Sequence, residues 1–370
     1  MLELKHQSSA ETLPVNSEYP RVEEATLGGM DFRIVFPPKI ITNTQLEQLG
    51  IITPGGHKFD SEYIRKTIGA ETRRVAEDVS IQSFAEAAAI PLVSKDIEEV
   101  IFMTSYPSRE GRELNTGHAR SLAEHLQLDG ITRSDTKNPT KDRHFACSTF
   151  ARVISEASSA KRVMIVGAEK YSEHLGTNDT ARAIFTDEAG AVSFRPGEDL
   201  TLLYSKEYYY PKSLNSLIEM PIDYSAFSSD AEGLRSIPVP LNPDGTIGTF
   251  VMNGKEVYKQ MMGVAEQIKT AVSDLTDGGI EKNKIAHIIP HQASLKVLNT
   301  IRNGLGEDLK DLQEKFYINM KRGNSSSISV MRGLTELIND QRVKVGDVLI
   351  FAGFGAGLYS HISAVRIEDQ

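Results

Sequence analysis

The sequence holds one cysteine and no tryptophan among its 370 residues. A single cysteine excludes an intramolecular disulfide and a cysteine-based metal site, which favours a reducing compartment. No apolar run approaches the roughly 20 residues needed to cross a bilayer, and the first 20 residues show no signal-peptide pattern. We therefore expect a cytoplasmic protein without a membrane partner.

Positive charge is also in deficit. The chain has 41 Lys and Arg against 50 Asp and Glu, a formal net charge of −9, so we expect no nucleic-acid partner, although an acidic surface can still carry a local basic patch. The content of 40% hydrophobic and 25% charged residues is that of a globular protein. The length suffices for one large domain or two ordinary ones.

Strand and helix patterns alternate along most of the chain, which predicts an α/β fold with buried parallel strands. We divide the sequence into a polar arm (1–24), a first half (25–196), an irregular capping insertion (197–243) and a second half (244–370). Each half begins with a strand and a helix and ends in an apolar hairpin that contains glycine. The two halves therefore share a coarse pattern.

The cysteine lies in "HFACSTFARVISE", between a short apolar approach and a segment with helical period. This places Cys147 at a strand-to-helix turn, where unpaired N–H groups at a helix start stabilise a thiolate. A lone cysteine can equally be a small buried core residue. The local pattern leaves both interpretations open.

Two histidines occur in "HIIPHQASLK". On a helix the four-residue spacing of His287 and His291 would indicate metal ligation, but Pro290 and the β-branched run favour a strand, and no third ligand is close. We expect no metal site. His291 would lie at the carboxyl edge of the sheet, where open α/β folds bind ligands, and His287 would be structural.

Two further stretches carry turn chemistry. "RGNSSSISV" places Asn324 between a glycine and a serine-rich helix start, which is ordinary turn and capping chemistry when taken alone. "FAGFGAGLYS" joins two apolar strands, whereas a dinucleotide-binding glycine loop opens a helix, so NAD is rejected. Such a glycine turn can instead aim a backbone N–H into a site.

A cysteine, a histidine and an asparagine in this order also occur in papain-like proteases. Those enzymes carry the cysteine near the mature N-terminus. Here Cys147 lies far along the chain, without a neighbouring tryptophan, disulfides or a secretory signal. The context therefore excludes the protease interpretation.

Taken in order, "FACSTF", "IIPHQASLK", "RGNSSSISV" and "GDVLIFAGFGAGLYSHISAVRI" resemble the signature stretches of β-ketoacyl-ACP synthase III, a condensing enzyme of the thiolase superfamily. The resemblance spans about residues 25–368. It implies a five-layered αβαβα fold of two pseudo-repeated halves with mixed sheets, and a homodimer.

The resemblance also implies the chemistry. Cys147 would accept the acyl group of an acyl-CoA, and His291 and Asn324 would be the other two catalytic residues. The backbone N–H groups of Cys147 and Gly357 would form the oxyanion hole. The implied reaction is a decarboxylative Claisen condensation with a malonyl thioester on acyl carrier protein or CoA, in fatty-acid or specialised polyketide-type metabolism. CoA and phosphopantetheine thioesters are its substrates, and no cofactor is needed.

The residues implied for substrate binding depart from the family pattern. Tyr63 stands where the family has a tryptophan against the CoA adenine, Arg182 is nearest to the family's adenine-flanking arginine, and Ser294 replaces an asparagine. Leu114 would line the acyl tunnel. Glu188 stands at a position where the family has glycine, and no local pattern explains it.

Three cations are candidates for contact with the acidic carrier protein: Lys296, Lys259 and Arg302. Each can equally be a solvated surface residue. The same holds for Glu110 and Glu113, which would act as acid or base in a non-decarboxylative condensing enzyme.

Two further alternatives are an acyltransferase that forms an ester or amide from acyl-Cys147, and a catalytically idle subunit of a heterodimeric synthase. Retention of His291 and Asn324 favours condensation.

Overall fold

The computed structural model describes residues 20–51, 58–77, 79–105, 118–128, 140–144, 150–157, 161–173, 175, 180–209, 218–219, 251–252, 258–259, 261–355 and 359–369. In this part of the chain no helix is long and apolar enough to cross a membrane.

The larger sheet has six strands in the order β1-β2-β8-β7-β5-β6. Strand β5 pairs in parallel with β6 and β7, whereas the β7–β8, β8–β2 and β2–β1 pairs are antiparallel. The first strand begins within the stretch expected as a polar arm, which is a correction of that boundary. The bounds are Arg21–Leu27 (β1), Met30–Phe36 (β2), Glu99–Thr104 (β5), Thr140–His144 (β6), Val163–Glu169 (β7) and Glu188–Phe194 (β8).

The second sheet has four strands in the order β12-β13-β14-β9. Strand β9 lies within the stretch expected to be an irregular insertion, yet it pairs antiparallel with β14 along its length. The insertion therefore cannot begin at residue 197, and most of 210–243 lies outside the described residues. The bounds are Leu200–Tyr209 (β9), Ile285–Pro290 (β12), Val348–Gly355 (β13) and Tyr359–Ile367 (β14).

The two sheets repeat one pairing pattern. In the larger sheet β5 is parallel to β7, β7 is antiparallel to β8, and β8 is antiparallel to β2. In the smaller sheet β12 is parallel to β13, β13 is antiparallel to β14, and β14 is antiparallel to β9. The expected pseudo-repeated halves with mixed sheets are confirmed, and β5 corresponds to β12 as β7 corresponds to β13.

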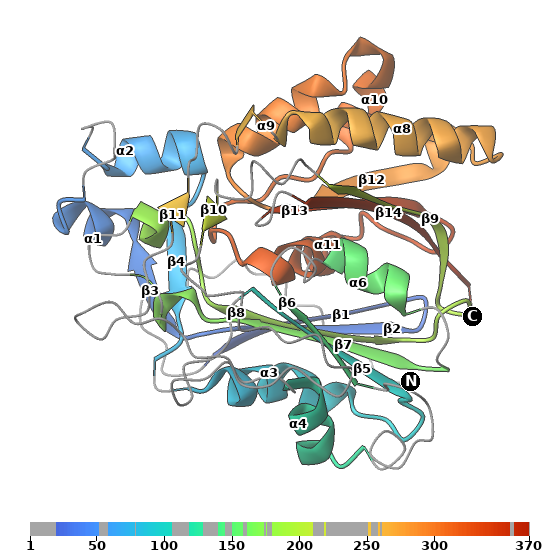
Figure 1. The fold of residues 1–370 in the computed structure, drawn as a ribbon, viewed down its shortest axis with the longest axis horizontal. Helices are drawn as coiled ribbons and strands as arrows, with labels where there is room; N and C mark the ends of the chain where they lie inside the picture. The colour runs from blue at the N-terminus through green and yellow to red at the C-terminus, as the bar shows by residue number, and fades with distance from the viewer. Residues whose placement is uncertain are drawn as a thin grey trace, which may run out of the picture.

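Helices cover the outer faces of both sheets and fill the space between them (Figure 1). Helices α3 and α4 lie on the outer face of the larger sheet, α6 and α11 lie between the sheets, and α8 to α10 lie over the smaller one. The five-layered αβαβα architecture is therefore confirmed. The bounds are Ile81–Ala89 (α3), His118–His125 (α4), Phe150–Glu156 (α6), Gly263–Asp277 (α8), Leu295–Gly304 (α9), Lys310–Glu314 (α10) and Ser329–Asn339 (α11).

Strand alternation explains why apolar cores form on both faces of each sheet. Successive side chains of a strand point to opposite faces, and both faces of the central strands are buried. In β7, Ile165 packs into the core between the sheets and Val166 into the core under α3. In β13, Phe351 packs between the sheets and Ile350 under α8.

The smaller elements follow local sequence signals. Helix α1 (Asn43–Gln48) begins after Thr42, whose hydroxyl accepts the Gln45 N–H in a capping box. Helix α3 gives way at Ala89 to a 3₁₀ turn that contains Pro91. The remaining short elements are β3 (Lys39–Thr42), α2 (Ser61–Tyr63), a π-helical turn (Ile64–Ile68), β4 (Thr72–Val75), β10 (Ile218–Glu219) and β11 (Val251–Met252).

A pair of glycines forms a hollow on the inner face of the larger sheet. Gly167 of β7 and Gly190 of β8 face each other in register. A Cβ at Gly167 would lie 2.2 Å from Ile328 Cδ1, and one at Gly190 would lie 3.1 Å from Ile328 Cγ2. Ile328 therefore sits where glycine side chains are missing, directly before α11.

Candidate active site

The structure places His291 directly after the last residue of β12. Its backbone N–H donates to the Ala352 carbonyl of β13 at 2.8 Å, and α9 begins four residues later. The side chain is 9% exposed and its ring meets the edge of Phe354 with ring centres 5.4 Å apart. The expected position at the carboxyl edge of a buried parallel strand is confirmed.

Ser329, the first residue of α11, holds the His291 ring. Its hydroxyl lies 2.8 Å from His291 Nδ1, 2.7 Å from the Ser326 carbonyl and 3.2 Å from the Gln292 N–H, which it accepts. Burial lowers the pKa of His291 to about 4, because the charged imidazolium would lose its hydration. The imidazole is therefore neutral at pH 7.

Asn324 is fixed through both its backbone and its side chain. Its N–H donates to the Ile184 carbonyl at 2.8 Å and its carbonyl accepts from Thr186 at 3.0 Å. Its Oδ1 accepts the Ser326 N–H at 2.7 Å, so the amide nitrogen must point the other way, toward the Ala293 carbonyl at 3.4 Å. The amide donor therefore faces the segment that carries His291.

Ser326 connects the two predicted catalytic residues. Its N–H donates to Asn324 Oδ1, and its carbonyl oxygen lies 2.7 Å from the hydroxyl oxygen of Ser329, which contacts the His291 ring. Its φ of 47° lies in the left-handed region that few residues other than glycine adopt. The structure thus brings His291 and Asn324 together through one strained serine.

A buried ion pair supports this turn and explains Glu188. Arg332 of α11 lies 2.8 Å from Glu188 of β8, and both side chains are 1% exposed. The same guanidinium donates to the carbonyl of Gly323 at 3.1 Å, and Gly323 is the residue that directly precedes Asn324. Because Glu188 and Arg332 lie 144 positions apart, no local sequence pattern could reveal the pair.

The structure does not describe the other predicted catalytic and tunnel residues. Cys147, Gly357, Leu114, Glu110 and Glu113 lie outside the described residues. In the chain, β6 ends at His144 and α6 begins at Phe150, and β13 ends at Gly355 before β14 begins at Tyr359.

A polar cluster joins the helix that follows Cys147 to the strand that follows Gly357. Arg152 of α6 donates to the Tyr359 hydroxyl at 2.7 Å and forms an ion pair with Glu207 of β9. The Tyr359 hydroxyl lies 3.2 Å from His361 Nδ1. Burial lowers the pKa of His361 to about 4. Sequence patterns missed this cluster because its members come from three separate elements.

The candidate binding residues are dispersed. Tyr63 is 37% exposed and packs on Phe59 with ring centres 5.3 Å apart. Arg182 donates to the Leu175 carbonyl at 2.9 Å. The Ser294 hydroxyl accepts the Val297 N–H at 3.3 Å and so caps α9.

Two of the three candidate carrier-contact cations lie close together. The Lys296 ammonium lies 5.0 Å from the ring centre of Tyr258, which directly precedes Lys259, and both lysines are exposed. The Tyr258 hydroxyl in turn bonds Thr300 of α9 at 2.6 Å. Arg302 lies in the last turn of α9 and is half-buried.

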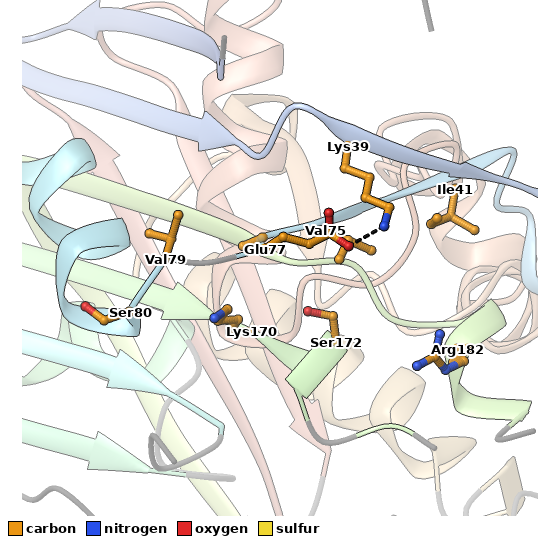
Figure 2. A pocket seen from close by; sticks show the side chains of 10 residues that line it. Lys39, Ile41, Val75, Glu77, Val79, Ser80, Lys170, Ser172 and Arg182 are labelled. Atoms are coloured by element: carbon orange, nitrogen blue, oxygen red, sulfur yellow. Dashed lines mark hydrogen bonds and ion pairs between the residues drawn. The ribbon is translucent and has the colours of Figure 1, made fainter. Parts of the chain in front are cut away.

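A cavity of about 770 Å³ opens beside β3 and β4 (Figure 2). Its wall includes Lys39, paired with Glu77, and also Lys170 and Arg182. Neither His291 nor Asn324 lines it. The cavity therefore adjoins one predicted binding residue, while the predicted chemistry lies elsewhere.

Comparison with known proteins agrees with this geometry. Residues 275–367 match the family described as 3-oxoacyl-[acyl-carrier-protein (ACP)] synthase III C terminal. The chain is 28% identical to β-ketoacyl-[acyl-carrier-protein] synthase III of Staphylococcus haemolyticus, covering 90% of this chain and 96% of the relative. It is 26% identical to the synthase III of Aquifex aeolicus, covering 88% and 94%.

A solved structure supports the fold. The priming β-ketosynthase of the R1128 polyketide biosynthetic pathway superposes with a TM-score of 0.71 at 20% identity, covering 95% of this chain and 99% of that one. Five layers and two repeated halves define a thiolase-like fold. The sequence matches show an acyltransferase that resembles the β-ketoacyl synthase III condensing enzymes.

The buried position of His291 predicts its titration. We expect its imidazole to stay neutral down to about pH 5, because burial lowers its pKa to about 4. Its neutral form therefore contributes stability that is lost as the pH falls from 6.5 toward 4. NMR of ¹⁵N-histidine-labelled protein, assigned with His291→Asn, measures this directly. Titration of His291 near pH 6.5 would contradict the prediction.

The buried Glu188–Arg332 ion pair predicts that removing one charge destabilises the protein more than removing both. Arg332→Met leaves a buried carboxylate without its partner and should lower the free energy of unfolding by about 3–5 kcal/mol. The double variant Glu188→Leu/Arg332→Met removes both charges and should lose clearly less. Urea unfolding measures both values, and an equal or larger loss in the double variant would refute the ion-pair explanation.

Proposed function

We propose that the enzyme joins an acyl group to a malonyl-derived unit by decarboxylative Claisen condensation. The Cys147 thiolate attacks an acyl-CoA, forms a thioester and releases CoA. Loss of CO₂ from a malonyl thioester leaves an enolate, which attacks the acyl carbonyl. The cysteine thiolate then leaves, and the product is a 3-oxoacyl thioester.

One observation carries this proposal: two neutral donors are held by one turn. The decarboxylation step needs hydrogen-bond donors at the thioester oxygen where negative charge develops. The neutral His291 ring and the oriented Asn324 amide are such donors, and Ser326 connects them. A histidine with a low pKa is suited to be a neutral hydrogen-bond donor. It is less suited to be a general base, because a base must accept a proton near pH 7.

The histidine tautomer follows from the proposed role. His291 Nδ1 and the Ser326 carbonyl compete for the single hydrogen of the Ser329 hydroxyl, at 2.8 and 2.7 Å. Donation to Nδ1 leaves the ring proton on Nε2, where it can reach a substrate oxygen. We therefore assign the Nε2–H tautomer to the reacting enzyme.

Two positively charged surfaces, the cavity beside β3 and β4 and the exposed lysines at α9 and residue 259, support thioester substrates. The cavity wall carries Lys39, Lys170 and Arg182 against one carboxylate, Glu77, which suits the phosphates of CoA. Exposed Lys296 and Lys259 suit an acidic acyl carrier protein as donor of the malonyl unit. These steps use only groups of the chain, so the proposal includes no metal or redox cofactor. It also includes a cytoplasmic homodimer in fatty-acid or polyketide-type metabolism.

Acyl transfer to Cys147 predicts a covalent adduct. Incubation with a panel of acyl-CoA and acyl-carrier donors should add one acyl mass, detected by intact-protein mass spectrometry. Cys147→Ala should abolish the adduct, and Asn324→Ala should keep it because that amide serves the second half-reaction. Absence of an adduct with every donor would overturn the thioester-transfer step.

Enolate stabilisation predicts a selective loss in the second half-reaction. Asn324→Ala removes one donor and should slow CO₂ release from a malonyl thioester by about 10²- to 10³-fold. Release of ¹⁴CO₂ from labelled malonyl-CoA measures the rate. Unchanged CO₂ release would instead favour an acyltransferase that forms an ester or amide.

A further inference from the structure

Glu169 is a buried carboxylate to which the proposed reaction assigns no role. It is the last residue of β7 and its side chain is fully buried. Both carboxylate oxygens lie 3.0 Å from the Ser105 N–H, which follows β5. The Ser327 N–H donates at 3.2 Å and the Ser327 hydroxyl donates as well. Glu169 therefore links the larger sheet to the turn before α11.

The hydrogen-bond partners of Glu169, which come from Ser105 and Ser327, match an ionised carboxylate better than they match the amide of a glutamine. Each of these groups donates a hydrogen, so two acceptor oxygens satisfy them. A glutamine would turn its NH₂ group toward one of these donors. Burial raises the pKa of Glu169 to about 7, and the hydrogen bonds from Ser105 and Ser327 oppose that rise. The fold thus retains a carboxylate at a place where ionisation is costly.

The turn that Glu169 holds is the one that connects the predicted catalytic residues. Ser327 directly follows Ser326, and the hydroxyls of Ser105 and Ser326 are hydrogen-bonded to each other. Ser326 is therefore fixed on both sides by groups that Glu169 binds. A non-glycine residue in the left-handed region costs about 1–3 kcal/mol and persists only where its surroundings impose it.

We propose that Glu169 is a positioning residue for the malonyl half-reaction. Through Ser105 and Ser327 its carboxylate keeps Ser326 in the conformation that directs the Asn324 amide and the His291 ring toward the same substrate oxygen. The proposal rests on the proposed function. It assigns Glu169 no contact with substrate.

The test compares the two half-reactions in Glu169→Gln in the full-length protein. Decarboxylation of malonyl-CoA should fall at least ten-fold, while acylation of Cys147 in a single turnover should change less than about two-fold. Glu169→Asp keeps the charge, and we expect it to recover part of the decarboxylation rate. Equal loss in both half-reactions, or no loss in either, would overturn the proposal.

Asp199→Asn is the matched control for a simple loss of stability. Asp199 is also fully buried, and it accepts the Arg195 N–H at 2.7 Å in the turn between β8 and β9. This variant should lower the melting temperature without changing the ratio of the two half-reaction rates. The same change of ratio in Asp199→Asn would show that destabilisation alone produces the effect.

Milder variants keep the test decisive if Glu169→Gln does not fold. Ser105→Ala and Ser326→Ala each remove one side of the hydroxyl pair. Each should slow decarboxylation about three-fold or more, and the double variant should be no slower than the worse single one. Strictly additive losses, or no loss, would refute the coupling through Ser326.

A structural readout separates this proposal from the proposed function. If the wild-type enzyme releases no CO₂, the proposed function fails. Hydrogen exchange of the Ser326 and Ser327 amides and the His291 NMR signals still test the turn. Glu169→Gln should accelerate that exchange at least ten-fold and shift the His291 signals. Unchanged exchange and unchanged signals would overturn the positioning role.

Discussion

The burial of α11 between two sheets is the constraint on which the site depends. Its residues from Ser329 to Thr335 are buried without interruption, including Arg332. Water cannot satisfy polar groups there, so each must find a protein partner. The turn before α11, which contains Ser326 and Ser327, meets this demand. Its main-chain and hydroxyl groups bond Asn324, Glu169 and Ser329, the first residue of α11.

This constraint also explains why so much charge lies in an apolar interior. Glu188 and Arg332 neutralise each other, and Arg332 also satisfies the Gly323 carbonyl. Such a pair contributes little net stability, because the cost of desolvating two ions offsets their attraction. Its effect is to fix geometry, since removal of either ion leaves the other unsatisfied. The buried polar groups around the turn therefore form one hydrogen-bonded network, in which substitution of a single member leaves its partners unsatisfied.

Local patterns in the sequence were sufficient for part of the structure. The strand before His291, the glycine before Asn324 and the two apolar strands β13 and β14 follow from period, turn chemistry and chain order. Strand β9 was missed because its membership of the second sheet depends on pairing with β14, far along the chain. Glu169, Glu188 and the Arg152 cluster were missed for the same reason. Their partners are close in space and distant in sequence.

The glycine hollow under Ile328 places the turn before α11 through contacts in the core, and these contacts are separate from the outer surfaces of the molecule. Gly167 and Gly190 let Ile328, the residue before α11, pack closely against the sheet, so the apolar core sets the position of the turn before α11. The cavity beside β3 and the charged face of α9 are built from other elements. Substitutions on those outer surfaces can therefore change what binds there without moving His291 and Asn324.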